Sequence, residues 1–108
     1  MSMLKDKKAV ITGAAQGLGA ALAERLAKEG CDVALFDLKE EAVRKTAEAV
    51  AAATGKKTIA VAGDITKEAD VERLFAEAQR AFGRVDVVVA NAAILIAEPI
   101  TDADAEKW

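Results

Sequence analysis

Histidine and tyrosine are absent from the sequence, and there is a single cysteine, Cys31, so no intrachain disulfide can form. This cysteine usage fits a reducing compartment. Cys31 stands beside an apolar run, and we expect it to be a small buried residue. Aromatic residues make up only 4% of the chain, so the core must be built from Ala, Val, Leu and Ile.

Long apolar runs and basic clusters are also missing. No run approaches the ~18 apolar residues of a membrane-spanning helix, and the N-terminus lacks a secretory pattern. The net charge is −3 and no basic patch stands out, which argues against nucleic acid as a partner. We therefore expect a cytoplasmic protein without a membrane or nucleic-acid partner.

What is present is a regular alternation of apolar strands and amphipathic helices over all 108 residues. Strands are predicted at 8–12, 32–37, 58–62 and 85–91, helices at 18–29, 40–54 and about 66–81, and the start of a fourth helix near Thr101. This order predicts an α/β fold, a doubly wound parallel sheet of the Rossmann type. We expect residues 1–108 to belong to a single domain of this type with strand order 3-2-1-4.

Several local features follow from this arrangement. The first helix should bury Leu18, Leu22 and Leu26, and Thr66 should cap the third helix. The first two helices should cover one face of the sheet and the third helix the other. The fourth strand would be an unpaired edge, so the chain by itself is expected to self-associate or be poorly soluble.

A glycine-rich turn joins the first strand to the first helix. Gly13, Gly17 and Gly19 are assigned the tight exit from the strand, the close approach to a pyrophosphate, and the close packing of helix on strand, in that order. Such a turn presents backbone N–H groups and the positive end of a helix dipole, which suit a phosphate. The spacing alone is a weak signal, so its context decides its meaning.

Polar side chains stand at the ends of the later strands. Asp37, Asp64 and Asn91 follow the second, third and fourth strands, and strand ends in a parallel sheet share one edge. Asp37 is placed to accept hydrogen bonds from an adenosine ribose, and Gln16 and Leu38 supply no cation for a 2′-phosphate, so NAD is favoured over NADP. The alternatives are that Asp37 caps the following helix and that Asp64 and Asn91 are ordinary turn residues.

These residues together resemble the short-chain dehydrogenase/reductase family. Thr12 to Gly19 matches its TGxxxGxG turn, Asp37 its NAD-selecting acid, Gly63-Asp64-Ile65 its adenine-side aspartate, and Ala90-Asn91-Ala92-Ala93 its NNAG segment; Asp86 also fits. The resemblance implies a cofactor site that comprises Gly13, Gln16, Gly17, Leu18, Gly19, Asp37, Leu38, Asp64, Ile65, Asn91, Ala92 and Ala93.

The sequence departs from the family pattern in two ways. Ala90 and Ala93 replace an Asn and a Gly of the NNAG segment, which we expect to be tolerated. The family's catalytic Ser, Tyr and Lys are not in this chain, where Ser2 is the only serine, so no catalytic residue is assigned. The resemblance therefore implies that residues 1–108 are the N-terminal part of a single dinucleotide-binding (Rossmann) domain. It implies the cofactor-binding half of an enzyme that acts on an alcohol or carbonyl and forms a homo-oligomer at full length.

Three functions are compatible with these patterns. The first is the NAD(H)-binding half of an oxidoreductase. The second is a nucleotide-binding module without catalysis. The third is a methyltransferase that uses S-adenosylmethionine, but the long gap between Gly13 and Gly17, together with Asp64, favours a dinucleotide. No metal site is predicted.

Overall fold

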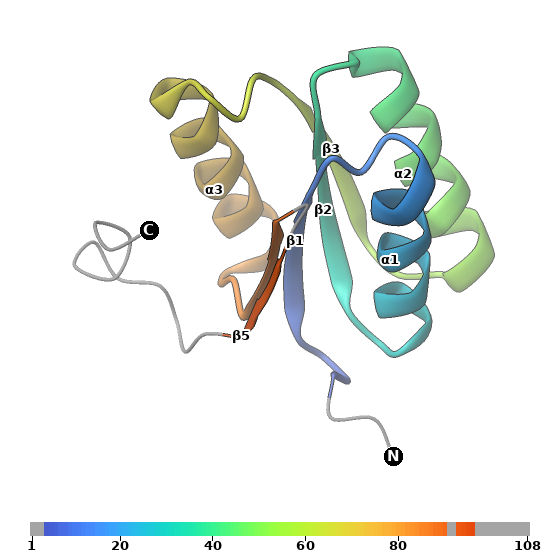
Figure 1. Ribbon diagram of the computed structural model, residues 1–108. Coiled ribbons are helices and arrows are strands. Elements are labelled where there is room, and N and C mark those ends of the chain that lie inside the picture. Colours follow the sequence, from blue (N-terminus) through green and yellow to red (C-terminus); the bar gives the residue numbers. More distant parts are fainter. Residues whose placement is uncertain (1–3, 91–92, 97–108) are drawn as a thin grey trace.

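The computed structural model describes residues 4–90 with their side chains and the backbone of residues 93–96. Strands and helices alternate as the sequence predicts (Figure 1). The elements are β1 (Lys8–Thr12), α1 (Gly17–Lys28), β2 (Asp32–Asp37), α2 (Glu40–Thr54), β3 (Thr58–Ala62), α3 (Glu68–Phe82), β4 (Val87–Ala90) and β5 (Ala93–Ile96).

The sheet has the order β3-β2-β1-β4-β5, and β1 to β4 are parallel to one another. The predicted order 3-2-1-4 is thus confirmed. The expectation that β4 is an unpaired edge is wrong, because β5 pairs with it antiparallel from Val87↔Ile96 to Ala90↔Ala93. An open strand edge leaves backbone N–H and C=O groups without hydrogen-bond partners. The apolar segment that follows β4 in the sequence supplies these partners.

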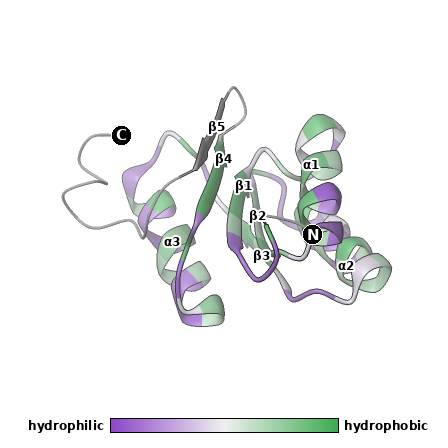
Figure 2. Ribbon diagram, turned by 90° about the horizontal axis from the view of Figure 1, so that it is seen from below, coloured by the Kyte–Doolittle hydropathy of each residue, from purple (hydrophilic) through white to green (hydrophobic). Residues whose placement is uncertain are grey.

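Helices cover both faces of the sheet. Helices α1 and α2 lie on one face and α3 on the other, as the crossovers predict (Figures 1 and 2). In Figure 2 strands β1 and β4 are mostly hydrophobic along their length, which suits strands covered on both sides. On the first face Ala9 and Ile11 pack with α1 and α2, whereas Val10 between them packs with Leu74 of α3.

The buried face of α1 differs from the prediction. Leu18 is 67% exposed, and the buried residues of the helix are Gly19, Ala23 and Ala27. Leu22 and Leu26 are only partly buried and pack at the side of this face. The period of the pattern was right, but the small residues face the sheet because they let the helix backbone approach it closely.

Helix ends agree with the prediction at their C-termini and differ at one N-terminus. Gly30 and Gly83 have φ values of +107° and +85° and end α1 and α3 in the left-handed region. Thr66 does not cap α3, which begins at Glu68, because its hydroxyl donates to the Asp64 carboxylate at 2.6 Å. The hydrogen bonds from Thr66 to the Asp64 side chain therefore form in place of a helix cap by Thr66.

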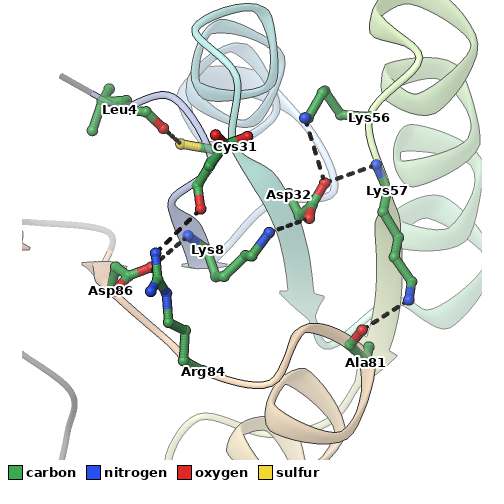
Figure 3. A network of polar contacts seen from close by, with 10 residues as sticks. Leu4, Lys8, Cys31, Asp32, Lys56, Lys57, Ala81, Arg84 and Asp86 are labelled. Atoms are coloured by element: carbon green, nitrogen blue, oxygen red, sulfur yellow. Dashed lines mark hydrogen bonds and ion pairs between the residues drawn. The ribbon is translucent and has the colours of Figure 1, made fainter. Parts of the chain in front are cut away.

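The edge of the sheet where the parallel strands begin carries a network of ion pairs (Figure 3). Asp32 Oδ2 accepts from Lys8 Nζ at 2.7 Å, and its Oδ1 accepts from the Lys57 amide at 3.1 Å. Asp86 Oδ2 accepts from the Lys8 amide and from Arg84 Nε, both at 2.9 Å. These contacts join β1 and β2 to the segments just before β3 and β4.

Cys31 lies beside this network and is fully buried. Its Sγ donates to the Leu4 carbonyl at 3.4 Å (Figure 3). Burial raises the pKa of the thiol, with the neighbouring Asp32 carboxylate adding to the effect. The predicted role of Cys31 as a small buried residue is confirmed.

Some predicted features lie outside the described residues: Asn91, Ala92, the helix start near Thr101 and the end of the chain. Within the described part, no helix is both long and apolar enough to cross a bilayer.

Candidate functional site

The glycine-rich turn between β1 and α1 has the geometry that its spacing predicts. Gly13 and Gly17 have φ values of +65° and +64°, which favour glycine. A Cβ on Gly19 would lie 2.0 Å from the Gly13 carbonyl oxygen, so only a glycine lets the helix pack this closely. A Cβ on Gly17 would meet no heavy atom of the described residues within 4 Å, so the turn is open at this point.

The N-terminus of α1 lacks the usual compensation for its positive end. Gln16 is the N-cap residue and its side chain makes no capping hydrogen bond, which is also true of the N-cap residues of α2 and α3. The first turn of α1 carries no acidic residue, whereas α2 begins with Glu40 and Glu41 and α3 with Glu68 and Asp70. The amides and the dipole of α1 are thus available to an anion from outside.

The turn is held in place by contacts from two other elements. The Ala14 amide donates to the Phe36 carbonyl at 3.1 Å, and the Ala15 amide donates to Asp37 Oδ2 at 3.0 Å. Thr46 Oγ1, on α2, donates to the Ala15 carbonyl at 2.7 Å. Sequence reasoning missed Thr46, because a threonine inside an amphipathic helix gives no local signal of a contact 31 residues away.

Asp37 connects the turn to the neighbouring loops. Besides accepting from the Ala15 amide, its Oδ1 accepts from the Lys39 amide at 3.3 Å, and its carbonyl accepts from the Gly63 amide at 3.0 Å. The N-cap residue of α2 is Lys39, so the alternative that Asp37 is the cap of this helix is wrong. An ionised carboxylate has about four acceptor sites, so capacity remains for hydroxyl groups of a ligand.

A hollow of about 210 Å³ lies at the ends of β1, β2 and β3. Its walls include the exposed apolar side chains of Leu38 and Ile65, which are 70% and 54% exposed. The lining residues are Gly13, Phe36, Asp37, Leu38, Gly63, Asp64 and Ile65. The structure thus brings together five of the predicted site residues at one hollow.

The other predicted site residues are placed differently. Gln16, Gly17, Leu18 and Gly19 form the turn and the start of α1 and do not line the hollow. Ala93 is the first residue of β5.

The loop after β3 is anchored by α3. Asp64 Oδ1 accepts from the Thr66 hydroxyl at 2.6 Å and from its amide at 2.9 Å, and these bonds hold the pKa of the Asp64 carboxyl below its usual range. The Asp64 amide donates to Asp70 Oδ2 at 2.8 Å. Arg73 donates to the Ala62 carbonyl and pairs with Asp70. The alternative that Asp64 is a turn residue is therefore correct locally, and the same turn places it at the hollow.

This arrangement fits a ligand with three chemical parts. The uncapped helix start suits an anion, the Asp37 carboxylate suits a diol, and Leu38 with Ile65 suits a flat apolar group. The sequence profile of the family described as short chain dehydrogenase matches residues 7–108. The chain belongs to the short-chain dehydrogenase/reductase family.

Curated relatives from this family match nearly all of the chain. The short-chain dehydrogenase/reductase eriH of Hericium erinaceus is 48% identical over 104 residues, 93% of this chain and 41% of the relative. The glucose 1-dehydrogenase of Gluconobacter oxydans is 43% identical over 102 residues, 94% of this chain and 38% of the relative. The chain therefore spans about two fifths of the length of these two relatives.

Solved structures show the same fold. A short-chain dehydrogenase/reductase from Burkholderia phymatum in complex with NAD has a TM-score of 0.77 and 39% identity, covering 82% of this chain and 31% of that one. An NAD⁺-bound xylitol dehydrogenase has a TM-score of 0.76 and 32% identity, covering 81% of this chain and 33% of that one.

No group of three or more His, Cys, Asp or Glu side chains among the described residues is arranged to hold a metal ion.

Proposed function

We propose that this chain is the NAD(H)-binding half of an oxidoreductase that transfers hydride between a nicotinamide cofactor and an alcohol or carbonyl substrate. The observation that carries the proposal is that the glycine-rich turn before α1 is bonded through its Ala15 amide to the Asp37 carboxylate, and that Gly13 and Asp37 line the same hollow. The NAD-bound structures that the chain resembles support it.

The residues of this chain divide the work of binding. The amides from Gln16 to Gly19 receive the diphosphate, and Asp37 accepts the hydroxyls of the adenosine ribose. Leu38 and Ile65 flank the base, and Asp64 closes the hollow beside it. Contacts from Asn91, Ala92 and Ala93 are part of the same proposal. The nicotinamide carries the hydride, and the protein supplies binding and orientation.

The preference for NAD over NADP rests on charge. A 2′-phosphate would come against the Asp37 carboxylate, and neither Gln16 nor Leu38 carries a cation to neutralise it. The preference is therefore set by repulsion of the wrong cofactor as well as by hydrogen bonds to the right one.

Substrate and assembly belong to the same proposal. Several relatives are dehydrogenases of sugars or polyols, including a glycerol dehydrogenase from Listeria innocua and a sorbitol dehydrogenase from Cereibacter sphaeroides. We accordingly propose a small alcohol or carbonyl compound as substrate. A cytoplasmic location and a homo-oligomeric full-length protein stay predictions from the sequence.

A non-catalytic nucleotide-binding role describes this chain taken by itself. It has no Tyr or His and only Ser2 as a serine, so it offers no acid or base of the kind the family uses. We expect it to bind NADH without turning over substrate. Family membership removes the support for the methyltransferase alternative.

The test is a titration of the intact protein with NADH and with NADPH, followed by nicotinamide fluorescence. We expect tighter binding of NADH, and a loss of about tenfold or more in Asp37→Ala, because hydrogen bonds to a charged group are removed. The preference over NADPH should shrink in the same variant. Glu41→Ala, which removes an exposed carboxylate on α2, is the matched control and should change neither affinity. Absence of NADH binding, or an unchanged preference in Asp37→Ala, would refute the proposal.

A further inference from the structure

Helix α2 supplies a side chain that holds the glycine-rich turn from behind. Thr46 Oγ1 lies 2.7 Å from the Ala15 carbonyl oxygen, and the two residues are 31 positions apart. Thr46 is partly buried on the side of α2 that neighbours α1. It neither lines the hollow nor belongs to the turn.

The bond acts on the direction of a peptide group. In a trans peptide the carbonyl and the following N–H point in opposite directions in one plane. Thr46 draws the Ala15 carbonyl toward α2, so the Gln16 amide of the same peptide unit points away from α2. Gln16 is the N-cap residue of the uncapped helix α1, so this amide stands at the start of the open helix end.

The preceding peptide is fixed independently. The Ala15 amide donates to Asp37 Oδ2, and the Ala14 amide donates to the Phe36 carbonyl. Ala15 is thus held on both sides, by the end of β2 and by α2. Without Thr46 the Ala15 carbonyl loses its partner from α2, and the peptide between Ala15 and Gln16 can rotate.

We propose that Thr46 is a positioning residue for cofactor binding, which orders the Ala15–Gln16 peptide before the ligand arrives. The role rests on the function proposed above. A turn that is already ordered loses less conformational entropy when the ligand binds. Loss of the Thr46 hydrogen bond therefore lowers affinity without removing a ligand contact. Thr46 touches no ligand itself and acts only through the turn.

The chain offers a matched control. Thr58 Oγ1 donates to the Ala47 carbonyl at 2.9 Å, a partly buried hydroxyl bonded to the helix next to Thr46. It stands at the first residue of β3, the end of the strand opposite to the hollow. Thr58→Val removes a bond of the same kind from the same helix without touching the turn.

The experiment measures NADH affinity by fluorescence and thermal unfolding in the intact wild-type protein, Thr46→Val, Thr46→Ser and Thr58→Val. Valine keeps the shape of threonine without the hydroxyl, and serine keeps the hydroxyl. We expect Thr46→Val to weaken NADH binding about two- to tenfold, and Thr46→Ser to stay within about twofold of wild type. Thr58→Val should lower the unfolding temperature as much as Thr46→Val but leave NADH affinity unchanged.

Steady-state kinetics of the full-length enzyme proposed above give a second readout. In that enzyme Thr46→Val should raise the KM for NAD and leave kcat close to wild type, because the turn binds ground state and transition state alike. If Thr46→Val does not fold, Thr46→Ala replaces it with the same expected result.

The outcomes separate the two proposals. Wild-type affinity for NADH in a folded Thr46→Val, or an equal loss in Thr58→Val, overturns the positioning role and leaves the proposed function standing. Failure of the wild-type protein to bind NADH overturns the proposed function, and the positioning role falls with it.

Discussion

At the scale of single residues, Gly19 shows how two general effects oppose each other. It lies inside α1, where replacing glycine by alanine normally favours the helix by about 1 kcal/mol. Its Cβ would, however, lie 2.0 Å from the Gly13 carbonyl oxygen, a backbone atom that cannot move aside like a flexible side chain. The contact is far inside van der Waals distance, so it outweighs the helix preference.

We therefore expect Gly19→Ala to destabilise the protein by about 1–3 kcal/mol, the usual range for overpacking. The turn must shift to make room, so NADH affinity should fall as well. Urea unfolding and NADH titration measure the two effects. Ala21→Gly, at an exposed position of the same helix, is the control and should lose about 1 kcal/mol from helix preference alone. A neutral or stabilised Gly19→Ala would show that α1 can move away from the turn at little cost.

At the scale of elements, the sequence predicted most where the signals were local. The bounds of β2, α2 and β3 agree residue by residue, because apolar runs and the glycine after α2 mark them. The prediction of the buried face of α1 was wrong. Whether Ala23 or Leu22 faces the sheet depends on how closely the helix approaches it, which the local sequence does not give. The prediction that Thr66 caps α3 was wrong because its hydroxyl donates to the Asp64 carboxylate instead.

The site followed the same division. Gly13, Asp37 and Asp64 could be placed together because parallel strands end at one edge. Thr46 could not be found, since its hydroxyl contacts the Ala15 carbonyl of the turn, which is 31 residues away in the sequence. The strand β5 was missed because it forms by hydrogen bonding to the free backbone edge of β4, and this edge exists only once the sheet is assembled.

Asp32, the first residue of β2, ties together the starts of three strands. Burial alone would raise its pKa, but the hydrogen bonds from Lys8 and from the Lys57 amide, with the nearby charges of Lys8 and Lys56, hold the pKa of the carboxyl below its usual range. The folded-state pKa thus lies under the unfolded value of about 3.9. Ionised Asp32 contributes its full stabilisation above about pH 4, and this is lost as the pH falls through the folded-state pKa.

We expect Asp32→Asn to lose about 1–2 kcal/mol of unfolding free energy at about pH 7, and this deficit to be smaller at about pH 2, because the stabilisation by the ionised carboxylate is lost as the pH falls through the lowered pKa. Urea unfolding of both proteins at the two pH values measures this difference. Glu41→Gln removes an exposed helix pair in which both side chains are 74% exposed, and should change stability by less than about 0.5 kcal/mol at either pH. A gap between Asp32→Asn and wild type that does not narrow in acid would mean that the charge of Asp32 does not stabilise the fold.

At the scale of the whole molecule, two cores share one sheet. Alternate residues of β2 point to opposite sides, with Val33 and Leu35 in the core under α1 and α2, and Ala34 and Phe36 in the core under α3. Neither face can lose its packing without loosening strands that the other face depends on. We infer that the described sheet and helices unfold as one unit, and that damage under α3 reaches the far side where the glycine-rich turn lies.

Leu74→Ala tests this coupling. Leu74 of α3 is fully buried, so its truncation should cost about 2–5 kcal/mol. If the two cores are one cooperative unit, the most protected backbone amides of β1, β2 and α2 should all lose hydrogen-exchange protection by the same free energy that urea unfolding reports. Ala76→Gly, at an exposed position of α3, should cost about 1 kcal/mol and separates loss of helix stability from loss of core packing. Retention of wild-type protection in α2 while α3 exchanges faster would contradict the single unit, since the face that carries the turn would then be stable without the helix on the opposite side.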